Sequence, residues 1–407
     1  QAQQDRPGIA RIEREVYVGH TEEAAGRWVN AYYVGPGLVR EEVHTFMAQS
    51  DTPEAPKRRR SEDNGKTWSE FEALPDVVTR EQGARIYWGQ GPALYDPEAE
   101  ALVSIWLRQT KLDLYHNHSF CRFSRDLGRT WSEPRQLMYE AGAKFDPNKP
   151  LNPDYLEHNQ SYFGNNIIRH SNGTLIHAGA AVNVPYENKT GKSYDKRVPA
   201  DATSIGSVCF IGKWNGDAGH YDWTAGERVW VPLEVSARGL MEPEVAELKD
   251  GRVLVVWRGS DTPETEGRKW FSVSEDGGKT LSPVTEWKYD DGSRFYSPSS
   301  FHRLLRHSVT GKLYWVGNIC PGPPSGNSPR YPLIIAEVDE TVPALKRETV
   351  AVIDTKQEGD SPKLQLSNFA LFEDRETHAV ELYLTRIGED PDDFWGADAY
   401  KYTLTFE

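Results

Sequence analysis

The chain has little of what metal, redox and membrane proteins depend on. Its three cysteines, Cys121, Cys209 and Cys320, lie far apart among 407 residues. They allow at most one disulfide and show no metal-ligand spacing. No apolar run approaches the ~18 residues of a membrane span, so we expect no membrane insertion. The chain also starts without methionine, and its first five residues resemble the mature end left by a removed signal peptide, which predicts a secreted or periplasmic protein.

The chain also lacks an excess of positive charge. Lys and Arg together number 47 against 61 Asp and Glu, which gives a net charge of −14. Such a chain is unsuited to binding nucleic acid or an anionic membrane surface, because both attract an excess of cations. A small anionic ligand is still compatible, since a few arginines can build a local site. No zinc, calcium or phosphate-loop signature is present, and we expect no metal and no other cofactor.

What the sequence does contain is a core made of short β-rich runs. Apolar residues make up 38% of the chain and include 13 tryptophans, most of which we expect in the core. No segment has a long helical period. The β-rich runs lie at residues 101–108, 166–178, 207–212, 253–258, 312–316, 333–338 and 380–386. The stretches 145–154 and 185–200 are predicted as loops rather than linkers, so we expect a single domain spanning 1–407.

An internal repeat sets the spacing of these runs. The pattern Ser-x-Asp-x-Gly-x-Thr-Trp occurs at 61–68 and 124–131, and again at 274–281 with Leu in place of Trp. It predicts a tight turn in which Asp accepts from turn amides and Gly takes a positive φ. A worn copy at 214–219 fills the longer gap. A unit of about 65 residues predicts an all-β, six-bladed β-propeller, or seven smaller blades, with both chain ends in one blade.

These repeats resemble the Asp-box of sialidases and related propellers. The resemblance implies a sialidase-like propeller fold. It implies less about activity, because Asp-boxes also occur in lyases, glucanases and receptors of the same architecture.

Residues 241–260 predict a hairpin with an Asp-Gly turn. Glu242 stands at the mouth of its first strand, and Arg258 ends the apolar run of its second strand. A charge buried there costs several kcal/mol unless it is paired. The two opposite charges therefore predict an ion pair, which is either structural or one corner of an anion site.

The sialidase resemblance assigns roles to these residues. Sialidases hold a substrate carboxylate with three arginines, whose guanidinium forks match it. Arg27, Arg258 and Arg330 resemble these three in chain order and local pattern. Asp51 resembles the acid/base aspartate, and Glu242 resembles the catalytic glutamate, a base or electrostatic partner. The resemblance implies an exo-acting glycoside hydrolase that removes a terminal carboxylate-bearing sugar from an acidic oligosaccharide or polysaccharide.

The chain departs from the family at the tyrosine nucleophile. The corresponding stretch is 365–372, where Asn368 or Phe369 stands in its place. The other tyrosines considered do not fit the motif: Tyr296, Tyr331 and Tyr383. Carboxylate binding is therefore better supported than double displacement.

Histidines leave a second interpretation open. Propeller-fold polysaccharide lyases neutralise a uronate carboxylate with arginine and use His or Tyr to remove the C5 proton. The candidates here are His44, His116, His118 and His158. Each is more often a structural residue, but His158 lies in a polar run and is our candidate substrate contact. A third interpretation is a glycan-binding propeller without activity.

Overall fold

The computed structural model describes residues 8–21, 26–47, 53–74, 78–181 and 205–407. Within these ranges nearly all regular structure is β-strand, and the two helices are α1 (Pro153–Glu157) and the 3-10 helix η1 (Arg347–Thr349). Neither helix of the described chain has the length and apolar character needed to cross a membrane. The all-β prediction is confirmed.

Contacts divide the chain into two compact units, residues 1–74 with 287–407 and residues 75–286. The described part of the first unit contains three antiparallel sheets. The first sheet is β2 (Arg27–Tyr33), β3 (Arg40–Met47), β4 (Pro53–Ser61) and β5 (Glu72–Ala73). The second is β20 (Arg303–Arg306), β21 (Leu313–Asn318), β22 (Leu333–Asp339) and β23 (Ala344–Leu345), with β24 (Ala351–Asp354) also on β22. The third is β25 (Ala370–Glu373), β26 (Val380–Thr385), β27 (Ala399–Phe406) and β1 (Ile9–Val18).

The described part of the second unit contains three more sheets. The first is β6 (Val78–Glu81), β7 (Ala84–Asp96), β8 (Ala101–Lys111), β9 (Tyr115–Ser124) and β10 (Arg135–Gln136). The second is β11 (Ser161–Tyr162), β13 (Leu175–Ala181), β14 (Gly206–Asn215) and β15 (His220–Ala225), with β12 (Ile168–Arg169) also on β13. The third is β16 (Met241–Glu247), β17 (Val253–Arg258), β18 (Lys269–Ser274) and β19 (Thr285–Glu286). These six sheets of the described chain are the blades of a six-bladed β-propeller, so the seven-bladed alternative is wrong.

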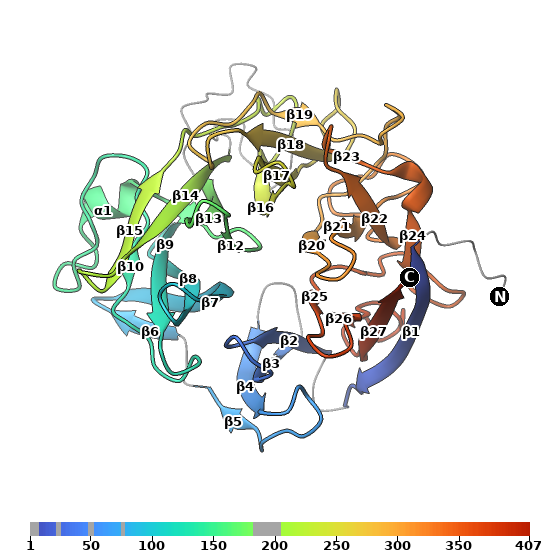
Figure 1. Ribbon diagram of the computed structural model, residues 1–407, viewed down its shortest axis with the longest axis horizontal. Coiled ribbons are helices and arrows are strands. Elements are labelled where there is room, and N and C mark those ends of the chain that lie inside the picture. Colours follow the sequence, from blue (N-terminus) through green and yellow to red (C-terminus); the bar gives the residue numbers. More distant parts are fainter. Residues whose placement is uncertain (1–7, 22–25, 48–52, 75–77, 182–204) are drawn as a thin grey trace. The chain divides into compact units, whose positions relative to one another are not determined.

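The last blade joins the two ends of the chain, as predicted. Strand β1 pairs antiparallel with β27, from Ile9 opposite Phe406 to Val18 opposite Ala399. The two strands lie side by side although they come from opposite ends of the colour scale (Figure 1). The tryptophans Trp257 and Trp315 are fully buried in their blades, which agrees with their predicted core role.

The repeated motif forms the predicted turn. In the first copy Asp63 accepts hydrogen bonds from the backbone N (2.8 Å) and the hydroxyl (2.7 Å) of Thr67. The Ser61 hydroxyl donates to Asp63 and accepts from the Gly65 amide at 2.7 Å, and Gly65 has φ +82°. The bonds to Thr67 and Ser61 lower the pKa of Asp63 to about 2. The copies at 124–131 and 274–281 repeat these bonds, and each follows the next-to-last strand of its blade.

Candidate anion-binding site

The hairpin β16–β17 brings Glu242 and Arg258 together. Arg258 Nη1 donates to Glu242 Oε1 at 2.6 Å, and 8% of the arginine side chain and 28% of the glutamate side chain are exposed. The turn closes through bonds between Leu248 and Arg252 and from Gly251 to Leu248. The predicted ion pair at the strand ends is confirmed. Because the glutamate side chain is partly exposed, this pair is nearer to solvent than a fully buried pair would be.

The backbone at Glu242 is strained. Its φ is +44°, and the pairing of β16 with β17 is irregular between Met241 and Glu244. A left-handed conformation at a residue with a Cβ costs about 1–3 kcal/mol and persists only where the surroundings enforce it. The irregular backbone directs the Glu242 side chain at the strand mouth, and such strain is concentrated at functional sites.

A loop of the neighbouring blade holds this strained backbone. The Asn165 amide side chain donates to Glu242 O at 3.2 Å, and the Asn165 backbone N donates to Pro243 O at 2.8 Å. Gly164 permits this approach, because a Cβ there would lie 2.6 Å from Pro243 O and 2.1 Å from Ala178 O. The position of Glu242 is therefore determined by tertiary contacts that sequence reasoning did not find.

Arg27 begins β2 and is half-buried. Its guanidinium carbon lies 4.8 Å from the centre of the Phe46 ring. Within the described chain it contacts no carboxylate. Burial, and then the charge of Arg59, lower the pKa of Arg27, and burial and Arg27 lower the pKa of Lys57. This end of the first blade thus gathers positive charge that an anion would neutralise.

Arg330 lies in the loop between β21 and β22. Its Nη1 donates to Gln365 Oε1 at 3.0 Å and its Nε donates to Asn327 O at 3.2 Å. The Leu366 amide donates to Arg330 O at 3.0 Å, so the loop before β25 runs beside this arginine. These contacts fix the position of the guanidinium in the loop.

The same loop is where the tyrosine nucleophile was sought. Phe369 is buried in the core and its ring packs edge-on against Phe301. Asn368 is exposed with φ +59°. The side chain of Gln365, three residues earlier than Asn368, contacts Arg330. Of the other tyrosines considered, Tyr331 donates to a backbone carbonyl at 3.3 Å.

His158 follows α1 and is exposed over 41% of its side chain. Its Nδ1 lies 3.0 Å from Asp154 O and 3.2 Å from Asp154 Oδ1. The hydrogen bond to the Asp154 carbonyl, with that residue's charge, raises the pKa of His158 above its ordinary value. An accessible histidine with two ring nitrogens is suited to contact a hydroxyl-rich ligand.

The other histidines are structural. His118 is fully buried, and its Nε2 lies 2.9 Å from Tyr155 O and 3.1 Å from His158 O, which holds the α1 segment on β9. Burial lowers its pKa to about 4. His44 is also buried, with Nε2 3.1 Å from Glu42 Oε2. His116 is half-buried against the Leu156 carbonyl. The two buried rings have no surface at which to remove a proton from substrate.

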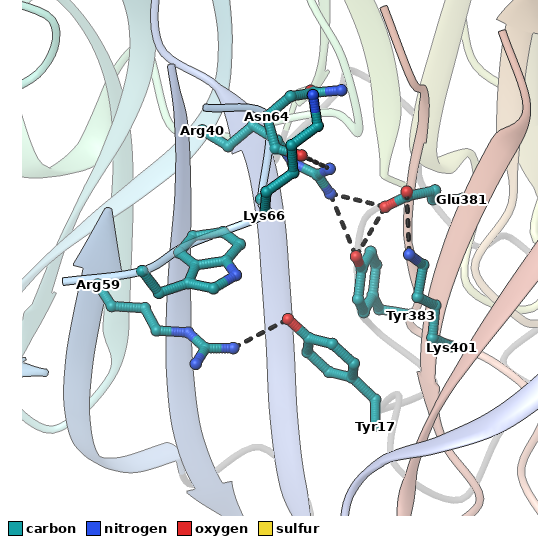
Figure 2. Close-up of a pocket in the computed structure, with 10 residues that line it drawn as sticks. Tyr17, Arg40, Arg59, Asn64, Lys66, Glu381, Tyr383 and Lys401 are labelled. Carbon is teal, nitrogen blue, oxygen red and sulfur yellow. Dashed lines mark hydrogen bonds and ion pairs between the residues drawn. The ribbon is translucent and has the colours of Figure 1, made fainter. Parts of the chain in front are cut away.

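A cavity of about 280 Å³ in the first unit was not predicted (Figure 2). Arg40, which is 3% exposed, donates to Glu381 Oε2 at 2.6 Å and to the Tyr383 hydroxyl at 3.2 Å. Lys401 Nζ lies 3.0 Å from Glu381 Oε1. Burial, and then the charge of Glu381, raise the pKa of Tyr383 far above its ordinary value, so this phenol keeps its proton. We call these four residues the paired cluster, because each of its cations meets a carboxylate.

The predicted site residues thus fall into three groups. The structure brings Glu242 and Arg258 into contact, with His158 in the same unit, residues 75–286. Arg27 and Arg330 belong to the other unit and do not contact each other. Asp51 lies outside the described residues. In the described part of the chain no three His, Cys, Asp or Glu side chains gather in a way that could hold a metal ion.

The sequence matches no protein-family model and no curated protein. Its structure is similar to that of a Dyadobacter fermentans protein of unknown function, with a TM-score of 0.60 and 15% identity over 98% of this chain and all of that one. It is also similar to the Trypanosoma rangeli sialidase bound to the inhibitor DANA, with a TM-score of 0.56 and 11% identity over 97% of this chain and 60% of the sialidase. A Penicillium chrysogenum alpha-L-arabinanase with arabinobiose matches with a TM-score of 0.52 and 14% identity over 96% of both chains. At these identities the likeness shows the fold, a six-bladed propeller like that of the sialidase.

Proposed function

We propose that the protein is a carbohydrate-active enzyme, an exo-acting glycoside hydrolase that removes a terminal carboxylate-bearing sugar from an acidic glycan. The observation that carries the proposal is the Glu242–Arg258 pair at a strand end. Contacts from the neighbouring blade hold the strained backbone of Glu242, and the glutamate side chain is partly exposed. The propeller fold, which the chain has in common with solved glycosidases, supports it.

In this proposal Arg27, Arg258 and Arg330 bind the substrate carboxylate. Arg27 meets no carboxylate within the described chain, and the side-chain amide of Gln365 orients the Arg330 guanidinium. Arg258 shares its fork between Glu242 and the ligand. His158 contacts sugar hydroxyls.

Asp51 and Glu242 carry the chemistry. Asp51 protonates the leaving glycosidic oxygen, while Glu242 takes a proton from the attacking water. The anomeric C–O bond breaks and a new one forms to the water oxygen. Because Asn368 or Phe369 stands where the family has its tyrosine nucleophile, we propose single displacement with inversion at the anomeric carbon.

The test is release of an acidic monosaccharide from a panel of sialylated and uronate-terminated glycans, followed by NMR to read the anomer first formed. Glu242→Gln and Asp51→Asn should each lower kcat by about 10²–10⁴-fold, the usual contribution of a positioned acid or base. An unsaturated uronate product would show that the protein is a lyase and not a hydrolase. Binding without any product would leave a glycan-binding protein.

A further inference from the structure

A row of positive charges crosses the sheet β6–β9 in the second unit. Arg80 on β6 pairs directly with Arg85 on β7, Arg85 pairs with Lys111 on β8, and Lys111 pairs with Tyr115 on β9. Directly paired residues share one face, with Cβ atoms about 4.5–5.5 Å apart. Three cations and one aromatic ring therefore lie side by side. We call these four residues the cationic row.

The row carries an unrelieved repulsion. Like charges directly opposite one another on a sheet are destabilising. In the part of the chain that the structure describes, no carboxylate contacts Arg80, Arg85 or Lys111, and the Lys111 ammonium lies 4.9 Å from the centre of the exposed Tyr115 ring. On the opposite face Arg108 is paired with Glu81 at 2.9 Å. Among the described residues, the cation on one face of the sheet has a carboxylate partner and the three cations on the other face have none.

The row borders a hollow that can take a ligand. Its volume is about 630 Å³, and the lining adds only one carboxylate, Asp113, to the three cations. Small-molecule sites typically measure about 300–1,000 Å³. Gly83, at the β6–β7 turn, leaves the space above it open, since a Cβ there would meet no atom within 4 Å.

The next positions on the same face offer hydrogen bonds. Tyr87 pairs with Gln109, and Gln109 pairs with Asn117. Gln109 Nε2 donates to Asn117 Oδ1 at 3.0 Å, which leaves further amide donors and acceptors for a ligand. An acidic glycan is recognised by cations that bind its acidic groups, by amides that bind its hydroxyls and by an aromatic ring that packs against a sugar ring. This face of the sheet offers all three.

We propose that the cationic row binds a stretch of polyanionic glycan, with successive carboxylate or sulfate groups on successive cations. The strands are about 4.8 Å apart, so the three charges are spread along a line rather than focused on one small ion. Arg80 and Lys111 are exposed, and exposed pairs are individually weak, so a ligand with several charges is favoured over one with a single charge. This site is additional to the bond-cleaving residues and does not depend on them.

The experiment is titration of the full chain with polygalacturonate, dextran sulfate and uncharged dextran by calorimetry, at low and physiological salt. We expect both charged polymers to bind and dextran not to bind. Arg80→Ala combined with Arg85→Ala should weaken binding at least tenfold and flatten its salt dependence, while Tyr115→Ala should weaken it a few-fold. Arg135→Ala, which removes an exposed arginine from the same blade outside the row, is the matched control and should bind like the unaltered protein.

Equal loss in the Arg135→Ala control, or unchanged binding by the double variant with an unaltered circular dichroism spectrum, would overturn the proposal. Single-stranded DNA bound as tightly as polygalacturonate would overturn the choice of a glycan. If only one of the two charged polymers binds, that result selects carboxylate or sulfate as the natural group. Glu242→Gln should retain binding to the row whether or not the protein proves to be a hydrolase, which separates this proposal from the one on catalysis.

Discussion

The paired cluster and the cationic row contain the same kinds of residue and differ in what surrounds them. In the cluster Arg40 and Lys401 share the buried Glu381. In the row Arg80, Arg85 and Lys111 face one another at an open hollow. A cation that pairs with a carboxylate of the protein contributes to the stability of the fold. A cation whose neighbours are other cations is available to an anionic ligand. The Glu242–Arg258 pair is intermediate, because it is paired and partly exposed.

The largest effect should follow from breaking the paired cluster. Arg40→Ala leaves Glu381 charged and buried without its main partner, which should lower the free energy of unfolding by about 3–5 kcal/mol. Urea unfolding measures it. Arg40→Lys keeps the positive charge but loses the guanidinium fork. Its free energy of unfolding should lie between those of the unaltered protein and Arg40→Ala. A loss below about 1 kcal/mol would mean that the cluster behaves like a surface pair.

The intermediate pair should separate activity from stability. Arg258→Lys keeps a positive charge beside Glu242 but cannot share a fork between glutamate and ligand. We expect KM for an acidic glycan to rise at least tenfold, with a melting temperature close to that of the unaltered protein. Steady-state kinetics and calorimetric melting check both parts. An unchanged KM would remove Arg258 from the carboxylate site.

The burial of His118 should make the stability of the protein depend on pH. His118 has its pKa lowered to about 4 by burial, with Arg108 and His116 also disfavouring its charge, whereas the unfolded chain has an ordinary histidine pKa of about 6.5. The unfolded chain therefore binds a proton first, and stability falls as pH drops from about 6.5 toward 4. Melting curves across that range should show the loss. His118→Gln should reduce the slope but not abolish it, because burial also lowers the pKa of His177 to about 4.

The smallest effect on stability should come from the cationic row. Arg85→Ala removes the central charge and its repulsion with both neighbours, so the free energy of unfolding should stay the same or rise by up to about 0.5 kcal/mol. Urea unfolding at low salt tests this against Arg40→Ala. A loss of several kcal/mol would show that Arg85 is structural and would erase the contrast between the two regions.

Much of the fold could be predicted because its signals are local. The turn at 61–68 is closed by bonds among Ser61, Asp63, Gly65 and Thr67, all within seven residues. The Glu242–Arg258 contact also follows from one short hairpin. Gln365 beside Arg330 did not follow, because that contact joins two loops that no period in the sequence relates.

By itself the sequence determined the strands, the repeated turn, the pairing of chain ends and the charge pair of one hairpin, since short-range hydrogen bonding and alternation specify them. Only the tertiary structure decided which charges far apart in the sequence are paired. Arg40 and Glu381 are 341 residues apart and meet because blades pack, while Arg80, Arg85 and Lys111 align because three strands pair in one register. Burial and strand register are properties of the packed sheets. Whether a charged side chain has a partner within the fold therefore depends on the tertiary structure.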